Sequence, residues 1–186
     1  MSRASSPPDR ACCCAVASPS EPVQSAPISG VFDLIDHFGH AVNERSYGDR
    51  HLLVFFGFTH CAVVCPRELT KLDGALRLLG PLASAIQPLY VTVDPGRDEP
   101  SAMRRYLSQF SADFIGLTGT AEQVEAAKQS YRVFAEPVHD AAAPGGYVVP
   151  HTAFAYLMAP GGRYKAHFSD SLDAEVVAQR MRRHLS

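Results

Sequence analysis

Two cysteines stand where a long apolar run of the chain ends. Residues 55–66 read FFGFTHCAVVCP, with Cys61 and Cys65 four positions apart and Pro66 directly behind them. If this segment is helical, the two thiols share one face about one turn apart, and Pro66 suits the first turn. The positive end of a helix favours thiolate, the form that attacks disulfides and binds soft metal ions. We therefore interpret the pair as functional, with two inert buried cysteines as the alternative.

The spacing of the pair leaves redox chemistry and metal binding both open. It is one residue longer than Cys-x-x-Cys, which does not prevent a disulfide, because the distance depends on the loop geometry. The extra residue also makes room for an ion, and two thiolates with an imidazole as third ligand would suit Cu(I) or zinc. Of the eight histidines, His139 and His151 flank a Gly/Pro-rich loop. His151 is the better candidate, because Pro150 stiffens its backbone and a predicted strand follows it.

The hydrophobic pattern predicts the elements that position these residues. Leucines recur at helical spacing after the cysteines until Gly80-Pro81 ends the helix. Further helices are predicted over Pro100–Phe110, after the capping-box pair Thr120 and Gln123, and from about Asp173. Buried strands are predicted at 51–58 and 89–95, and a third, short strand at 114–119. Hairpins are predicted at 31–42 and around Gly161-Gly162, with a loop at 139–150.

This order of elements predicts an α/β fold of thioredoxin-like topology. A central mixed sheet would be flanked by helices, with a hairpin added at the N-terminal side. We assign this domain to residues 28–186 and interpret residues 1–27, rich in Ser, Pro and Ala, as a disordered tail or linker. The tail holds Cys12, Cys13 and Cys14, which we interpret as incidental, with metal capture or lipidation as alternatives.

Composition excludes several classes of function. The chain has 186 residues, 46% of them hydrophobic, and a formal net charge of -2, so charge gives no reason to expect nucleic acid as a partner. No apolar stretch approaches the roughly 18 to 20 residues that cross a bilayer. The run ACCCAVA is too short for the core of a signal peptide. We expect a monomer.

Taken together, three motifs resemble the Sco/SenC family of copper chaperones. They are FFGFTHCAVVCP, then TVDPGRDEP at 92–100, then PHTAFAYLMAPGGRY at 150–164, and the likeness covers about residues 29–185. The resemblance implies a thioredoxin-like fold that holds copper, as Cu(I) or Cu(II), through Cys61, Cys65 and His151. It also implies delivery to the binuclear copper centre of cytochrome c oxidase subunit II, or to another copper-protein client. The implied location is the periplasm or the inner membrane.

Two departures from the family pattern affect these expectations. Pro150 stands where the family often has an aspartate, which could orient the imidazole, so we expect a looser site or a shifted affinity. The family's membrane tether is also not visible in this sequence, so the chain either starts downstream of it or is soluble.

The competing interpretation is a thiol–disulfide oxidoreductase, in which Cys61 attacks and Cys65 resolves the mixed disulfide. A peroxiredoxin-like peroxidase is disfavoured because a TPVC-like signature is absent, and a purely structural module would require inert thiols. Two carboxylates have open roles. Asp94 either lies near the cysteine loop or simply ends a strand, and Asp98 is expected to cap the following helix.

Overall fold

The computed structural model describes residues 27–185. Nearly all of the predicted tail, including the three adjacent cysteines, lies outside the described residues.

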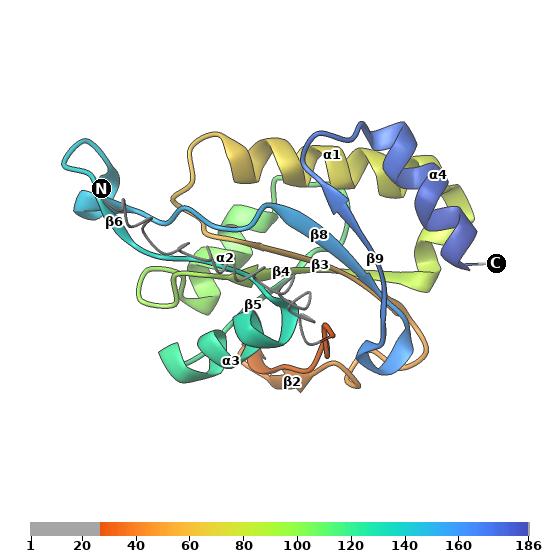
Figure 1. Ribbon diagram of the computed structural model, residues 1–186, viewed down its shortest axis with the longest axis horizontal. Helices are drawn as coiled ribbons and strands as arrows, with labels where there is room; N and C mark the ends of the chain where they lie inside the picture. Colours follow the sequence, from red (N-terminus) through yellow and green to blue (C-terminus); the bar gives the residue numbers. More distant parts are fainter. Residues whose placement is uncertain (1–26, 186) are drawn as a thin grey trace, which may run out of the picture.

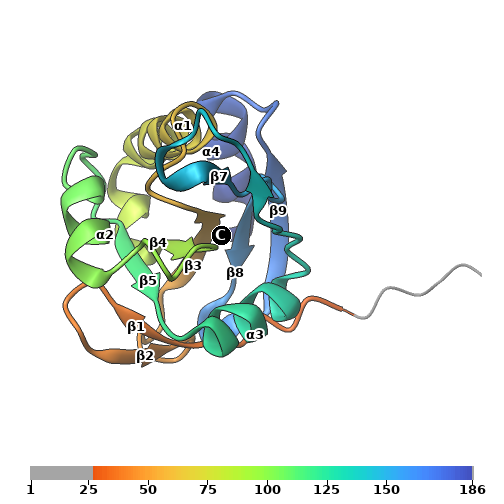
Figure 2. The same ribbon diagram turned by 90° about the vertical axis from the view of Figure 1, so that its left-hand side faces the viewer.

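A seven-stranded mixed sheet forms the centre of the molecule (Figure 2). Its order is β2-β1-β5-β4-β3-β8-β9, in which β3, β4 and β5 run parallel and the remaining neighbours pair antiparallel. Strands β3 and β4 are buried along almost their whole length, as their continuous apolar sequences predict. The strands are β1 (Asp33–Asp36), β2 (Ala41–Asn43), β3 (His51–Gly57), β4 (Ile86–Thr92), β5 (Ile115–Thr118), β8 (Phe154–Met158) and β9 (Tyr164–Ser169).

Helices cover both faces of this sheet, which gives three layers (Figure 1). Helices α1 (Val64–Leu79), α2 (Pro100–Leu107) and α4 (Ala174–Leu185) share one hydrophobic cluster with one face. Helix α3 (Ala121–Tyr131) packs on the other face. Three short 3-10 helices complete the fold: η1 (Gly80–Ala85), η2 (Pro144–Gly146) and η3 (Pro160–Gly162).

The topology confirms the predicted fold class. The run β3-α1-β4 followed later by β8-β9-α4 forms a thioredoxin-like core, and the β1–β2 hairpin extends the sheet beyond β5. Helix α1 ends at Gly80, whose φ of 61° suits glycine, and α3 begins with the predicted capping box of Thr120 and Gln123. The prediction of a plain loop at 139–150 was wrong, because β6 (Val138–His139) and β7 (Tyr147–Val148) pair there as a small separate sheet.

Strand direction explains why one edge of the sheet collects the candidate residues. Gly57 at the end of β3 is in register with Thr92 at the end of β4, so the segments that follow both strands emerge side by side. Strand β8 runs antiparallel to β3, with Ala155 opposite Phe55. The segment that leads into β8 therefore arrives at the same edge, and it carries His151.

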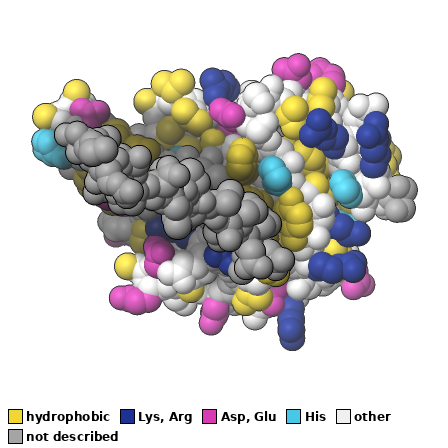
Figure 3. Space-filling view, in the orientation of Figure 1, with side chains coloured by type: hydrophobic (Ala, Val, Ile, Leu, Met, Phe, Trp, Pro, Cys, Tyr) yellow, Lys and Arg dark blue, Asp and Glu magenta, His cyan; other side chains and the backbone are white. Residues whose placement is uncertain are grey.

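The surface shows side chains of both charges, with hydrophobic groups between them (Figure 3). Within residues 27–185, no helix is long and apolar enough to cross a membrane.

Candidate functional site

The turn between β3 and α1 holds both cysteines. The backbone N–H of Cys61 donates to the carbonyl of Phe58 at 3.2 Å, which tightens the turn. Helix α1 has no side-chain oxygen cap, and the N–H of Cys65 donates to the Cys61 sulfur at 3.4 Å. Cys61 therefore lies against the positive end of the helix. Cys61 is half-buried, Cys65 is fully buried, and both are free thiols in this structure.

The two thiols differ strongly in acidity. A hydrogen bond from Cys65, together with the backbone N–H groups of Cys65, Val63 and Val64, lowers the pKa of Cys61 to about 5, although burial opposes this shift. Donating that hydrogen bond to Cys61, and then burial, raises the pKa of Cys65. At neutral pH the pair therefore consists of a Cys61 thiolate and a protonated Cys65.

His151 approaches the cysteine pair from the segment that leads into β8. Its backbone pairs with Ala135 in an isolated antiparallel bridge. Its Nδ1 lies 2.8 Å from the carbonyl oxygen of Val149, which can only accept, so Nδ1 carries the proton in the neutral ring. The unprotonated Nε2 faces the Cys65 sulfur at 3.8 Å. The Val149 carbonyl thus orients the imidazole with a free lone pair toward the thiols.

Cys65 is the common neighbour of the other two predicted ligands. It contacts the Cys61 sulfur through its N–H and His151 through its own sulfur. The three groups do not yet form a compact site, since among residues 27–185 no three His, Cys, Asp or Glu side chains converge tightly enough to hold a metal ion. The structure therefore brings the predicted residues to one place, while ligation of an ion remains a prediction. The alternative histidine, His139, is exposed on β6.

Asp98 has a role that the sequence did not reveal. Its carboxylate accepts hydrogen bonds from the Thr59 N–H at 3.0 Å, the Thr59 hydroxyl at 2.6 Å and the Thr92 hydroxyl at 2.7 Å. The expectation that it caps α2 was wrong, because the N-cap of α2 is Glu99, which has no capping side-chain bond. Burial raises the pKa of Asp98, while the Thr59 and Thr92 bonds oppose the shift. Asp98 ties the start of the cysteine turn to β4.

Asp94 lies near the cysteine loop, as one of its two expected roles required. Its carboxylate accepts hydrogen bonds from the Arg97 guanidinium and, at 3.0 Å, from the Tyr147 hydroxyl. The Arg97 guanidinium also lies 3.7 Å from the centroid of the Tyr147 ring and 5.7 Å from that of Phe58. This cation–π stack joins the loop after β4 to the small β6–β7 sheet, and so holds the segment before His151 against the cysteine turn.

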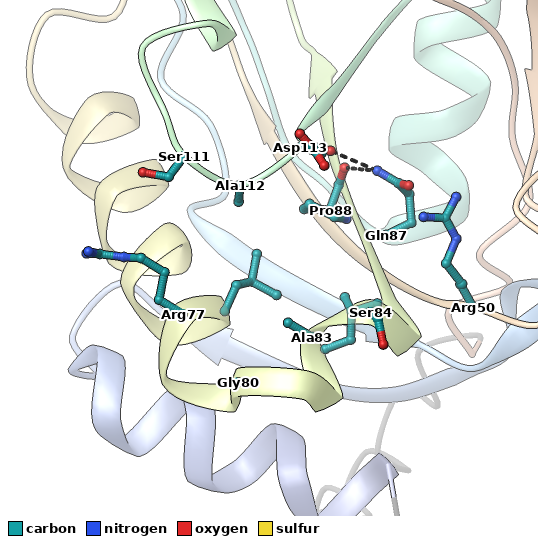
Figure 4. Close-up of a pocket in the computed structure, with 12 residues that line it drawn as sticks. Arg50, Arg77, Gly80, Ala83, Ser84, Gln87, Pro88, Ser111, Ala112 and Asp113 are labelled. Atoms are coloured by element: carbon teal, nitrogen blue, oxygen red, sulfur yellow. Dashed lines mark hydrogen bonds between the residues drawn. The ribbon is translucent and has the colours of Figure 1, made fainter.

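A cavity of about 620 Å³ opens beside the candidate residues. Cys61 and His151 contribute to its wall, and most of its other lining is apolar, including Val63, Val148 and Pro150. A second cavity, of about 350 Å³, lies at the opposite end of the strands (Figure 4). There Arg50 and Arg77 lie on opposite sides, and the Gln87 amide is already bonded to backbone carbonyls. Because open α/β sheets bind ligands at the carboxyl ends of their strands, we assign chemistry to the first cavity.

Comparison with known proteins gives a consistent result. The family description SCO1/SenC matches residues 20–186. The mitochondrial SCO2 homolog of Bos taurus is 38% identical over 167 residues, which make up 88% of this chain and 62% of the bovine protein. The present chain therefore spans less than two thirds of that relative.

Two solved structures resemble the fold closely and contain copper. ScoI of Bradyrhizobium japonicum with copper bound superposes with a TM-score of 0.76 at 37% identity, covering 84% of this chain and 99% of that one. Yeast Sco1 with copper bound gives a TM-score of 0.77 at 34% identity, covering 85% of this chain and 88% of that one.

Proposed function

Because this chain belongs to the SCO1/SenC family, we propose that it binds copper through Cys61, Cys65 and His151 and delivers it to a copper-protein client. The delivery serves cytochrome c oxidase assembly, and the specific acceptor is the binuclear copper centre of subunit II of the oxidase. The place of action is outside the cytoplasm, in the periplasm or at the inner membrane.

The observation that carries this proposal is the approach of His151 Nε2 to within 3.8 Å of the Cys65 sulfur. A thiol–disulfide exchange needs no imidazole at that position, whereas a soft metal ion gains a third ligand from it. The Nδ1 bond to the Val149 carbonyl presents the lone pair of Nε2 to the sulfur. The copper-bound relatives at 37% and 34% identity support the same cargo.

The difference in acidity between the two thiols suits stepwise capture and release of the copper ion. Cys61 is already a thiolate at neutral pH and lies in the wall of the cavity, so it is the first ligand to meet the ion. Cys65 must lose its proton to follow, and His151 completes the set through Nε2. During delivery a ligand of the client enters through the same cavity and replaces these ligands in turn.

A Cu(I) titration of the reduced protein against a competing chelator tests the proposal. We expect one tight equivalent in the wild type and a loss of tight binding in Cys61→Ser, Cys65→Ser and His151→Ala. His139→Ala is the matched control, because this histidine belongs to the same segment but is exposed on β6. It should bind as tightly as the wild type. An unchanged affinity in His151→Ala would refute the three-ligand site.

A second function, reduction of client disulfides, is favoured by the difference in thiol acidity. The Cys61 thiolate would attack a client disulfide, forming a mixed disulfide and releasing one client thiolate. Cys65 would then lose its proton and attack the Cys61 sulfur. This releases the second client thiol and leaves a Cys61–Cys65 disulfide, which an external dithiol must reduce before another cycle. In this role His151→Ala would retain full exchange activity, whereas Cys65→Ser would stop at the mixed disulfide.

A further inference from the structure

A fully buried tyrosine lies beside the candidate site with its hydroxyl unpaired. Tyr90 stands in the middle of β4 and is 0% exposed. Within the described residues no hydrogen bond of ordinary geometry reaches its hydroxyl, although the Cys65 sulfur and the Tyr106 hydroxyl lie close enough to interact with it. An unpaired buried hydroxyl costs free energy of folding, so a phenylalanine at this position would be the better core residue. The hydroxyl therefore calls for an explanation in terms of function.

Gly57 brings this hydroxyl close to the Cys65 sulfur. A Cβ atom built on Gly57 would lie 2.5 Å from the oxygen of Tyr90 and 2.8 Å from the sulfur of Cys65. Both distances are shorter than real side-chain contacts, so any other residue at 57 would displace the tyrosine or the cysteine. The oxygen and the sulfur thus border the same small space that the missing side chain leaves.

The rings around Tyr90 fix its direction. Its ring stacks on that of Tyr106 with centroids 5.8 Å apart, and it packs against Phe55 at 6.0 Å. The ring contacts themselves are apolar, and the Tyr106 hydroxyl lies near that of Tyr90. Burial raises the pKa of Tyr90 well above its ordinary value, so the oxygen keeps its proton and can act as a donor.

Cys65 becomes a strong acceptor only when it loses its own proton. In the free pair it donates to Cys61, and a neutral thiol sulfur accepts hydrogen bonds weakly. As a copper ligand it is a thiolate inside a hydrophobic cluster, where a charge without a hydrogen bond is costly.

We propose that Tyr90 is a positioning residue whose hydroxyl donates a hydrogen bond to the Cys65 sulfur and so holds that sulfur in place as a copper ligand. This inference rests on the proposed copper function for its purpose, although the contact itself does not depend on copper. It explains why β4 carries a tyrosine at this buried position and why Gly57, at the end of β3, leaves space for its hydroxyl.

The experiment compares Tyr90→Phe with wild type in the full chain, using Cu(I) and a competing chelator. We expect Cu(I) binding about tenfold or more weaker, since hydrogen bonds to charged groups are the strong ones. With Cu(II) bound, the sulfur-to-copper charge-transfer band should move to longer wavelength, because the thiolate gives up electrons more readily without the bond. A merely structural role of the ring would leave this band in place.

Tyr47→Phe is the matched control. Tyr47 is also buried with an unpartnered hydroxyl, but it belongs to the hydrophobic cluster on the other face of the sheet. It should keep the wild-type affinity and band position. Equal losses in the two variants would show a general effect of the core and overturn the proposal, as would an unchanged band and affinity in Tyr90→Phe.

A measurement without copper separates this inference from the proposed function. Two glutathione molecules reduce the Cys61–Cys65 disulfide and are joined as glutathione disulfide, and the equilibrium constant of this reaction is measured. Loss of the Tyr90 hydroxyl should disfavour the reduced pair by about threefold, because in that pair the hydroxyl polarises the S–H that Cys65 donates to the Cys61 thiolate, whereas the disulfide carries no charge. If the wild type bound no copper, the proposed function would fail, and this equilibrium alone would decide on Tyr90.

Discussion

At the scale of single residues, the site depends on an unequal sharing of one proton between two sulfurs. Cys61 receives hydrogen bonds from Cys65 and from the first turn of α1, whereas Cys65 is enclosed by the hydrophobic cluster. The more exposed Cys61 is therefore ionised, and the buried Cys65 keeps its proton. The sequence predicted Cys61 as the attacking cysteine, but the size of the difference in acidity depends on this hydrogen bonding.

This difference predicts the pH dependence of alkylation. Because the pKa of Cys61 is lowered to about 5, its reaction with iodoacetamide should be half-maximal near pH 5 and level above about pH 6. Peptide mapping by mass spectrometry should find the label on Cys61 and not on the buried Cys65. Free cysteine, with a pKa of about 8.5, is the control. A half-maximal rate for Cys61 near that of free cysteine would contradict the assigned thiolate.

At the scale of elements, the loops after β3 and β4 act as one unit through Asp98. This carboxylate accepts three hydrogen bonds from Thr59 and Thr92, so the cysteine turn starts from a fixed point on the neighbouring strand. Register between β3 and β4 brings these groups together, since Gly57 lies opposite Thr92. Asp98 therefore contributes both to stability and to the placement of the turn.

Replacing Asp98 by alanine should harm both properties. Its three donors, one of them fully buried on Thr92 and two partly buried on Thr59, would lose their acceptor, and we expect the free energy of unfolding in urea to fall by about 2–3 kcal/mol. Cu(I) affinity should fall as well, because Thr59 no longer fixes the turn. Glu99→Ala is the control, since this neighbouring carboxylate is exposed and makes no capping bond. If both variants lost the same stability, the three hydrogen bonds would not carry the effect.

The parts that the sequence did not predict depend on contacts between distant segments. The cysteine pair, the strand before it and the helix after it follow from local pattern, and His151 follows from its place at a loop end. The bond between Asp98 and Thr59 spans 39 positions, and the stack of Arg97 on Tyr147 spans 50. Two-residue strands such as β6 leave too short a pattern to detect. Tyr90 looks like any aromatic residue of a buried strand until its unpaired hydroxyl is seen.

At the scale of the whole molecule, the candidate site and the added hairpin occupy different parts of the sheet. The carboxyl ends of β3 and β4 carry the thiols and their supports, while the added β1–β2 hairpin closes the sheet beyond β5. The junction of that hairpin holds a buried histidine. The backbone of His37 donates to the Gly116 carbonyl at 2.8 Å, and its ring Nδ1 accepts from the Gly116 N–H at 3.1 Å. The second bond requires an unprotonated Nδ1.

This junction predicts that stability falls in mild acid. Burial lowers the pKa of His37, with Arg104 adding to the shift and Asp36 opposing it, so the unfolded chain binds this proton more readily than the folded one. The contribution of His37 is complete above its unfolded pKa of about 6.5 and is lost progressively as pH falls below it. His37→Asn keeps an acceptor for Gly116 without titrating, so its free energy of unfolding in urea should fall less than that of the wild type between pH 7 and pH 5. The exposed His139→Asn should follow the wild type, and parallel curves for all three proteins would refute the assignment.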